Sequence, residues 1–74
     1  YTNRGYVKAA MSDHRGAIVD YTKAVEINPN YAIAYFRRGC SQNLLGDKES
    51  SIQDLKTSAA LGYSQASEMI KSIL

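Results

Sequence analysis

The sequence predicts an all-α fold of about five helices, built from antiparallel helix-turn-helix repeats that stack on one another. Three observations predict it. The chain resembles itself when it is shifted by 34 residues, its apolar residues recur with helical spacing, and residues that begin or end helices separate these stretches. The shift pairs identical residues: Tyr1 with Tyr35, Arg4 with Arg38, Gly5 with Gly39, Asp13 with Asp47, Ile18 with Ile52, Asp20 with Asp54 and Ala32 with Ala66.

The first unit is expected over residues 1–30, with helices over about 1–11 and 14–27. Asp13 can cap free N–H groups at the start of the second helix. Pro29 cannot donate a helix hydrogen bond and moves the preceding residue out of the helical region, so this helix should end near residue 27. Asn30 is expected to cap the helix that follows. The apolar stripe of the second helix consists of Ala17, Ile18, Tyr21, Ala24 and Val25.

The second unit is expected over residues 31–64, with helices over about 31–45 and 48–61. Asp47 should cap the later of these helices. Gly46 and Gly62 occupy positions typical of the glycine that follows a helix end. The stripe of the later helix repeats that of the first unit, with two serines as its small members: Ser51, Ile52, Leu55, Ser58 and Ala59.

Residues 65–74 are predicted to form a capping helix with one apolar and one polar face, which suits the open end of a stack. The apolar face consists of Ala66, Met69, Ile70, Ile73 and Leu74, and the polar face of Gln65, Glu68, Lys71 and Ser72.

Size and composition exclude several classes of function. A chain of 74 residues is one small domain in which a deep, walled cavity is not expected. It has no run approaching the roughly 18 apolar residues of a membrane span, and a formal charge of +2 with interleaved signs gives no reason to expect nucleic acid or an anionic membrane. The single cysteine, Cys40, favours a reducing, cytoplasmic compartment. A start at Tyr1 suggests a fragment of a longer protein.

The arrangement resembles the tetratricopeptide repeat, a helix-turn-helix unit of 34 residues, over essentially the whole chain. This resemblance implies a right-handed α-solenoid. In the second unit Ser51, Leu55 and Ser58 replace the usual Ala, aromatic and Ala, and Tyr63 stands where a proline is usual, as expected of a last repeat. The residues that carry the match are Tyr1 and Tyr35, Gly5 and Gly39, Ala17, Tyr21 and Ala24, and Pro29.

The resemblance implies a non-catalytic module that binds a peptide or a helix in the groove lined by the first helix of each unit. Helical geometry selects the residues that should face this groove. The candidates are Thr2 and Tyr6 in the first unit, and Ile33, Phe36, Arg37, Cys40 and Asn43 in the second. Phe36 is the main candidate for an anchor, and the alternative is that it packs on the fifth helix or on the neighbouring first helix.

Two further arginines are predicted to be structural. Arg4 and Arg38 each precede an aspartate by sixteen residues, Asp20 and Asp54, so each pair can meet across an antiparallel hairpin. Such an ion pair would set register and contribute about 1 kcal/mol or less.

The sequence gives no support for an enzyme, a metal site or a cofactor. Ser12, Asp13 and His14 contain the residue types of a catalytic triad, but neighbours in a turn point apart. Some family members hold carboxylate tails of chaperones with a clamp of Lys and Asn. Thr2, Tyr6 and Arg37 stand at three of those clamp positions, so this ligand is not expected.

The leading hypothesis is therefore a scaffold or adaptor that binds a protein or peptide. Two alternatives remain open. An exposed first helix could lead to self-association through the N-terminal face of the repeat. Helical repeats of similar length also read single-stranded RNA, and Arg4, Lys8, Arg37 and Arg38 would favour it, but interleaved aspartates argue against it.

Overall fold

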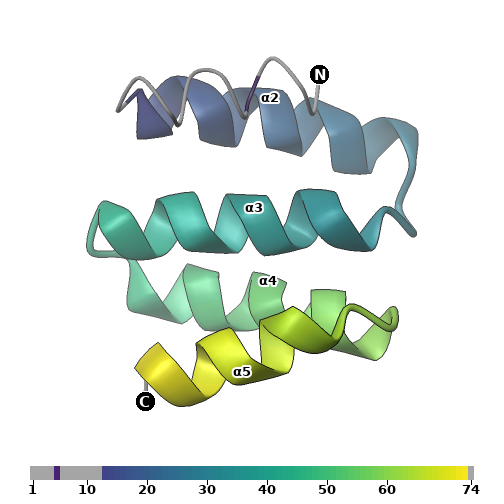
Figure 1. Cartoon of the computed structure of the whole chain (residues 1–74). Helices are drawn as coiled ribbons and strands as arrows, with labels where there is room; N and C mark the ends of the chain where they lie inside the picture. The colour runs from purple at the N-terminus through teal and green to yellow at the C-terminus, as the bar shows by residue number, and fades with distance from the viewer. Residues whose placement is uncertain (1–4, 6–12, 74) are drawn as a thin grey trace.

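A computed structural model describes residue 5 and residues 13–73 of the chain (Figure 1). In this part of the chain there are four helices: α2 (His14–Ile27), α3 (Ala32–Leu44), α4 (Lys48–Ala60) and α5 (Ser64–Ile73). The predicted all-α fold is confirmed, and the bounds of these helices agree with the predicted ones to within one residue. The predicted helix over residues 1–11 lies outside the described residues except for Gly5, which is helical and buried.

Consecutive helices run antiparallel and lie side by side (Figure 1). Helix α3 packs between α2 and α4, and α5 packs on α4. None of the described helices is long and apolar enough to cross a lipid bilayer.

The helix ends follow the residues predicted to make them. The Asp13 carboxylate accepts a hydrogen bond from the Gly16 N–H (3.1 Å), and the Asp47 carboxylate accepts one from the Ser50 N–H (3.3 Å). Gly46 and Gly62 have φ values of +90° and +103°, a region that L-residues other than glycine rarely adopt. Both positions therefore depend on glycine, as predicted for residues that follow a helix end.

One predicted cap is wrong. The N-cap position of α3 is Tyr31, which makes no side-chain capping bond, and Asn30 does not cap the helix. Instead, the Asn28 side-chain oxygen accepts a hydrogen bond from the Asn30 N–H (3.2 Å), and the Tyr31 N–H bonds the Asn28 carbonyl (3.1 Å). Because Asn28 organises the turn around Pro29, α3 begins one residue later than a cap at Asn30 would require.

The core consists of small residues where helices cross and larger ones between them. A Cβ added at Gly39 of α3 would lie 3.0 Å from Leu55 Cγ and 3.1 Å from the Ser51 carbonyl oxygen of α4, so the absence of a side chain allows the two helices to approach. Two buried serines of α4 donate to carbonyls of α3: Ser51 Oγ to Gly39 (2.6 Å) and Ser58 Oγ to Ala32 (2.7 Å). The buried apolar residues are Ala17, Tyr21, Ala24, Val25, Ala34, Leu55 and Ala66.

Candidate functional site

The face of α3 predicted to bind a partner is only partly covered. Its predicted residues, unlike those of the core, are all half-buried: Ile33, Phe36, Arg37, Cys40 and Asn43. Half-burial means that each has a neighbour within the fold and a side still open to solvent. The two candidates from the first unit, Thr2 and Tyr6, lie outside the described residues.

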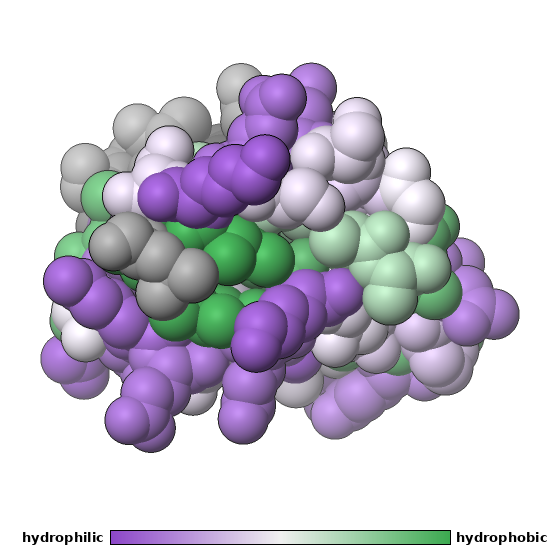
Figure 2. Space-filling view, turned by 90° about the horizontal axis from the view of Figure 1, so that it is seen from below, coloured by the Kyte–Doolittle hydropathy of each residue, from purple (hydrophilic) through white to green (hydrophobic). Residues whose placement is uncertain are grey.

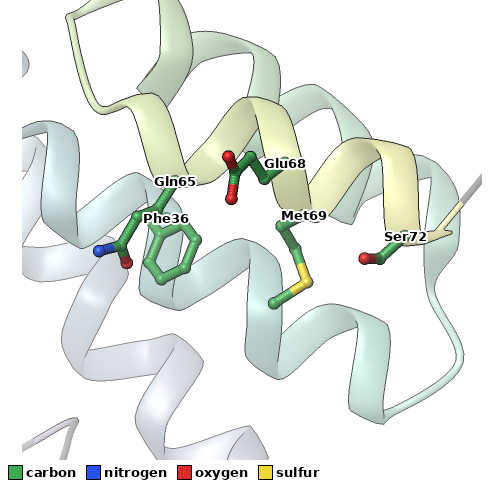
Figure 3. A pocket seen from close by; sticks show the side chains of 5 residues that line it. All are labelled: Phe36, Gln65, Glu68, Met69 and Ser72. Atoms are coloured by element: carbon green, nitrogen blue, oxygen red, sulfur yellow. The ribbon is translucent and has the colours of Figure 1, made fainter.

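A hollow of about 370 Å³ opens between α3 and α5. Phe36 lines it from α3, and its ring packs on the ring of Tyr63 at a centroid distance of 4.9 Å and an interplanar angle of 51°. Figure 3 shows the Phe36 ring, the Glu68 carboxylate and the Met69 thioether turned toward the same space. We call this feature the α3/α5 hollow; its lining residues are Phe36, Gln65, Glu68, Met69 and Ser72.

The position of Phe36 leaves room for both predicted roles, packing within the fold and contact with a partner. The ring packs on Tyr63, the residue that precedes α5, and it also lines an open hollow beside that helix. Sequence reasoning missed the α5 side of the hollow because it assigned Gln65, Glu68 and Ser72 to a solvated face. The sequence signal that could have found it was the expected packing of a capping helix next to the last repeat. Such packing can bring one edge of that helix beside the side of α3 that is predicted to face a groove.

Polar side chains border the hollow, and one of them, Glu68, is charged. Glu68 is exposed and makes no hydrogen bond or ion pair with any described residue. Gln65 is held by Tyr63, whose hydroxyl donates to the Gln65 side-chain oxygen (3.3 Å). The hollow combines the apolar side chains of Phe36 and Met69 with polar ones, a combination typical of interfaces. Figure 2 shows the molecule from below, and on that side apolar side chains form a strip bordered by hydrophilic ones.

Arg38 belongs to the fold rather than to the face that the sequence predicts to bind a partner. Its Nε and Nη2 donate to the two carboxylate oxygens of Asp54 (2.6 and 2.8 Å), and only 18% and 11% of the two side chains are exposed. The guanidinium also lies 5.5 Å from the centroid of the Tyr35 ring and donates to Thr22 (3.3 Å). The bond to Asp54 raises the pKa of Arg38, so the pair stays charged. The predicted ion pair is confirmed; its predicted twin involves Arg4, which lies outside the described residues.

Cys40 follows Phe36 by one turn of α3. Burial raises the pKa of its thiol, and the charge of Arg37 partly opposes this shift. The thiol is therefore protonated at neutral pH and acts as a small apolar group. In the described part of the chain, no cluster of three or more His, Cys, Asp or Glu residues could hold a metal ion.

Comparison with known proteins identifies the repeat. Residues 1–31 match one tetratricopeptide-repeat family model and residues 20–53 match another. The chain is 42% identical over 38 residues to human "Tetratricopeptide repeat protein 6", an alignment that covers 51% of this chain and 7% of that protein. It is 31% identical over 71 residues to the human and rat "Mitochondrial import receptor subunit TOM70", which covers 95% of this chain and 12% of each receptor subunit.

The chain therefore spans only a small part of the length of these relatives, 7% to 12%. The two family models together match residues 1–53, which include the whole of the first predicted unit and the first helix of the second. The antiparallel helix pairs and the close approach at Gly39 agree with that match. On these grounds the chain belongs to the tetratricopeptide-repeat family.

Proposed function

We propose that this chain is a non-catalytic scaffold or adaptor module that binds a peptide segment or a helix of a partner protein on the α3 face and the adjoining edge of α5. Tetratricopeptide repeats in general are protein–protein interaction modules, and the α3/α5 hollow is the observation that supports this particular surface. On α3 the proposed surface consists of Ile33, Phe36, Arg37, Cys40 and Asn43, with Thr2 and Tyr6 as candidate extensions in the first unit. On α5 it consists of Gln65, Glu68, Met69 and Ser72.

The hollow suits a side chain of a partner better than an enclosed small molecule. Its volume of about 370 Å³ is open to solvent between two helices. Phe36 and Met69 offer apolar contact, while Gln65, Glu68 and Ser72 offer polar groups around it. An aromatic anchor of this type dominates the binding energy of many interfaces. With few such anchors, we expect modest affinity, because association and ordering costs offset much of the gain.

The proposal is tested by selecting binders from a displayed library of random peptides on the immobilised 74-residue chain. Selected peptides are then labelled with a fluorophore, and their affinities are measured by fluorescence polarisation. We expect a family of related peptides that share an apolar residue. If no peptide is enriched over a blank surface, the proposed function fails.

A matched pair of variants locates the binding. Ser72→Tyr places a bulky ring at the edge of the hollow, whereas Ser67→Tyr places the same ring at an exposed serine that does not line it. The two positions are about 140° apart around the helix. We expect Ser72→Tyr to weaken the selected peptides by at least about tenfold and Ser67→Tyr to leave them nearly unchanged. Equal effects of both variants would place the contact elsewhere.

We also propose that the protein is located in the cytoplasm. A single half-buried cysteine agrees with a cytoplasmic location. The similarity to "Mitochondrial import receptor subunit TOM70" adds a position at the mitochondrial surface as the second candidate. Cell fractionation with an antibody to the native protein distinguishes the two, since a cytoplasmic protein stays in the supernatant when mitochondria are sedimented.

A further inference from the structure

We propose that the α3/α5 hollow selects an apolar side chain that has a lysine or arginine beside it in the partner sequence. This inference rests on the proposed function and adds to it the chemistry of the ligand. Two features of the hollow support it: the charge of Glu68 and the aromatic ring of Phe36 in its wall.

Glu68 is the one charged residue that lines the hollow among the described residues. Its carboxylate is exposed, is not bound to any described residue and lies in the middle of α5, where it does not cap the helix start. Figure 3 shows this carboxylate turned toward the space between the Phe36 ring and Met69. An incoming carboxylate would be repelled there, and an incoming cation would gain an ion pair.

The nearby cations do not cancel this charge. Arg38 is bound through two hydrogen bonds to Asp54. Arg37 does not line the hollow and already has an interaction partner in the chain. Lys71 is exposed on α5, but it does not line the hollow and makes no ion pair with Glu68. The local charge at the hollow is thus opposite in sign to the net charge of +2.

The ring of Phe36 favours the same ligand. It lines the hollow beside the Glu68 side chain (Figure 3). The face of an aromatic ring attracts a lysine or arginine cation within about 6 Å of its centroid. The partner cation can therefore contact both a carboxylate and a ring while its apolar neighbour packs on Met69. The long alkyl stem of lysine or arginine adds apolar contact of its own.

The test uses sequencing of the selected peptides. Selection is carried out in parallel on the unaltered chain, on Glu68→Lys and on Glu26→Lys. Both variants change the net charge equally, but Glu26 is an exposed residue of α2 that does not line the hollow. We expect lysine and arginine next to the apolar position to be enriched about two- to fivefold over serine on the unaltered chain and on Glu26→Lys. On Glu68→Lys we expect the preference to change to aspartate and glutamate.

The outcomes separate this inference from the proposed function. Peptides that are lost on Ser72→Tyr but show no basic preference, or keep the same preference on Glu68→Lys, would overturn the inference and leave the proposed function intact. Failure to select any peptide, or peptides unaffected by Ser72→Tyr, would overturn both. A preference that weakens between low and high salt while apolar enrichment persists would support the inference, since exposed ion pairs are screened.

Discussion

Helices α2 and α4 occupy equivalent places in the two repeats but are built from different side chains. At the positions where α2 has Ala17 and Ala24, α4 has Ser51 and Ser58. All four are buried, and each serine hydroxyl donates to a backbone carbonyl of α3. The comparison shows that such a buried position requires a small side chain rather than an apolar one, because the neighbouring helix supplies an acceptor.

The larger position of the stripe differs as well. Tyr21 of α2 and Leu55 of α4 each lie against the glycine of the preceding helix, Gly5 and Gly39. Tyr21 is 1% exposed and Leu55 is fully buried. The glycine contact is thus common to both repeats, although the side chain that fills the space is aromatic in one and aliphatic in the other.

Removal of the Leu55 side chain in the second repeat should lower the stability of the fold most. Leu55→Ala should destabilise the fold by about 2–5 kcal/mol, because it removes a fully buried side chain and leaves a cavity between α3 and α4. Urea unfolding followed by circular dichroism measures it. A loss below about 1 kcal/mol would mean that this repeat contributes little to the cooperative unit.

Breaking the ion pair of the second repeat should cause the next largest loss of stability. Arg38→Met leaves the Asp54 carboxylate, which is 11% exposed, without its two charge-assisted hydrogen bonds. We expect a loss of about 1–3 kcal/mol, between the values for exposed and fully buried pairs and above the sequence-based estimate. Arg15→Met, at an exposed arginine of α2, serves as the control in urea unfolding. Because the hydrogen bond to Asp54 raises the pKa of Arg38, the stability that this pair contributes is fully present at pH values below the ordinary arginine pKa.

Urea unfolding of Arg4→Met compares the contribution of the arginine in the first repeat with that of Arg38 in the second. If Arg4 and Asp20 form the predicted twin of the confirmed pair, Arg4→Met should cost about as much as Arg38→Met, in the range of about 1–3 kcal/mol. A loss indistinguishable from that of Arg15→Met would show that only the second repeat uses this ion pair.

The two glycines should tolerate a methyl group unequally. A Cβ at Gly5 would lie 2.7 Å from a ring carbon of Tyr21, whereas the closest atom at Gly39 would be 3.0 Å away. We expect Gly5→Ala to cost about 1–3 kcal/mol through overpacking. Gly39→Ala should cost less, because its closest contact would be longer; the gain of about 1 kcal/mol in helix propensity applies to both helical positions. Thermal unfolding of both variants gives the order, and the reverse order would contradict the geometry described for the first repeat.

The smallest effects concern the serines. Ser51→Ala and Ser58→Ala each make α4 more like α2 and should cost about 0.5–1.5 kcal/mol, the net contribution of a buried hydrogen bond. The carbonyls of Gly39 and Ala32 are inside a helix, so neither loses its only donor. A gain in stability in both variants would mean that the hydroxyls are merely tolerated.

Much of the fold could be predicted from the sequence because its signals are local. Asp13 and Asp47 cap within three residues, and Gly46 and Gly62 end helices through their own backbone conformation. The repeat also predicted the pairing of Arg38 with Asp54, which depends only on antiparallel helices. The cap at Asn30 is wrong because the turn closed by the Tyr31 N–H and the Asn28 carbonyl leaves Tyr31, rather than Asn30, at the N-cap position of α3.

The candidate site was less predictable because it depends on how two helices meet. The face of α3 follows from helical geometry, but the rotation of α5 on α4 depends on tertiary packing around Ala66. That rotation brings Glu68 and Ser72 to the hollow, although the polar pattern of α5 alone indicated only a solvated face. The hydroxyl bonds of Ser51 and Ser58 were missed for the same reason, since their acceptors lie on another helix.

Nuclear magnetic resonance of the labelled 74-residue chain, titrated with a selected peptide, tests most directly whether a partner binds at the α3/α5 hollow. If it binds there, the amide shifts will concentrate on α3 from Ile33 to Asn43 and on α5 from Gln65 to Ser72, with the Phe36 and Met69 side-chain signals among the most affected. Shifts concentrated instead on the exposed side of α2, around Val19 and Lys23, would show that the partner binds elsewhere.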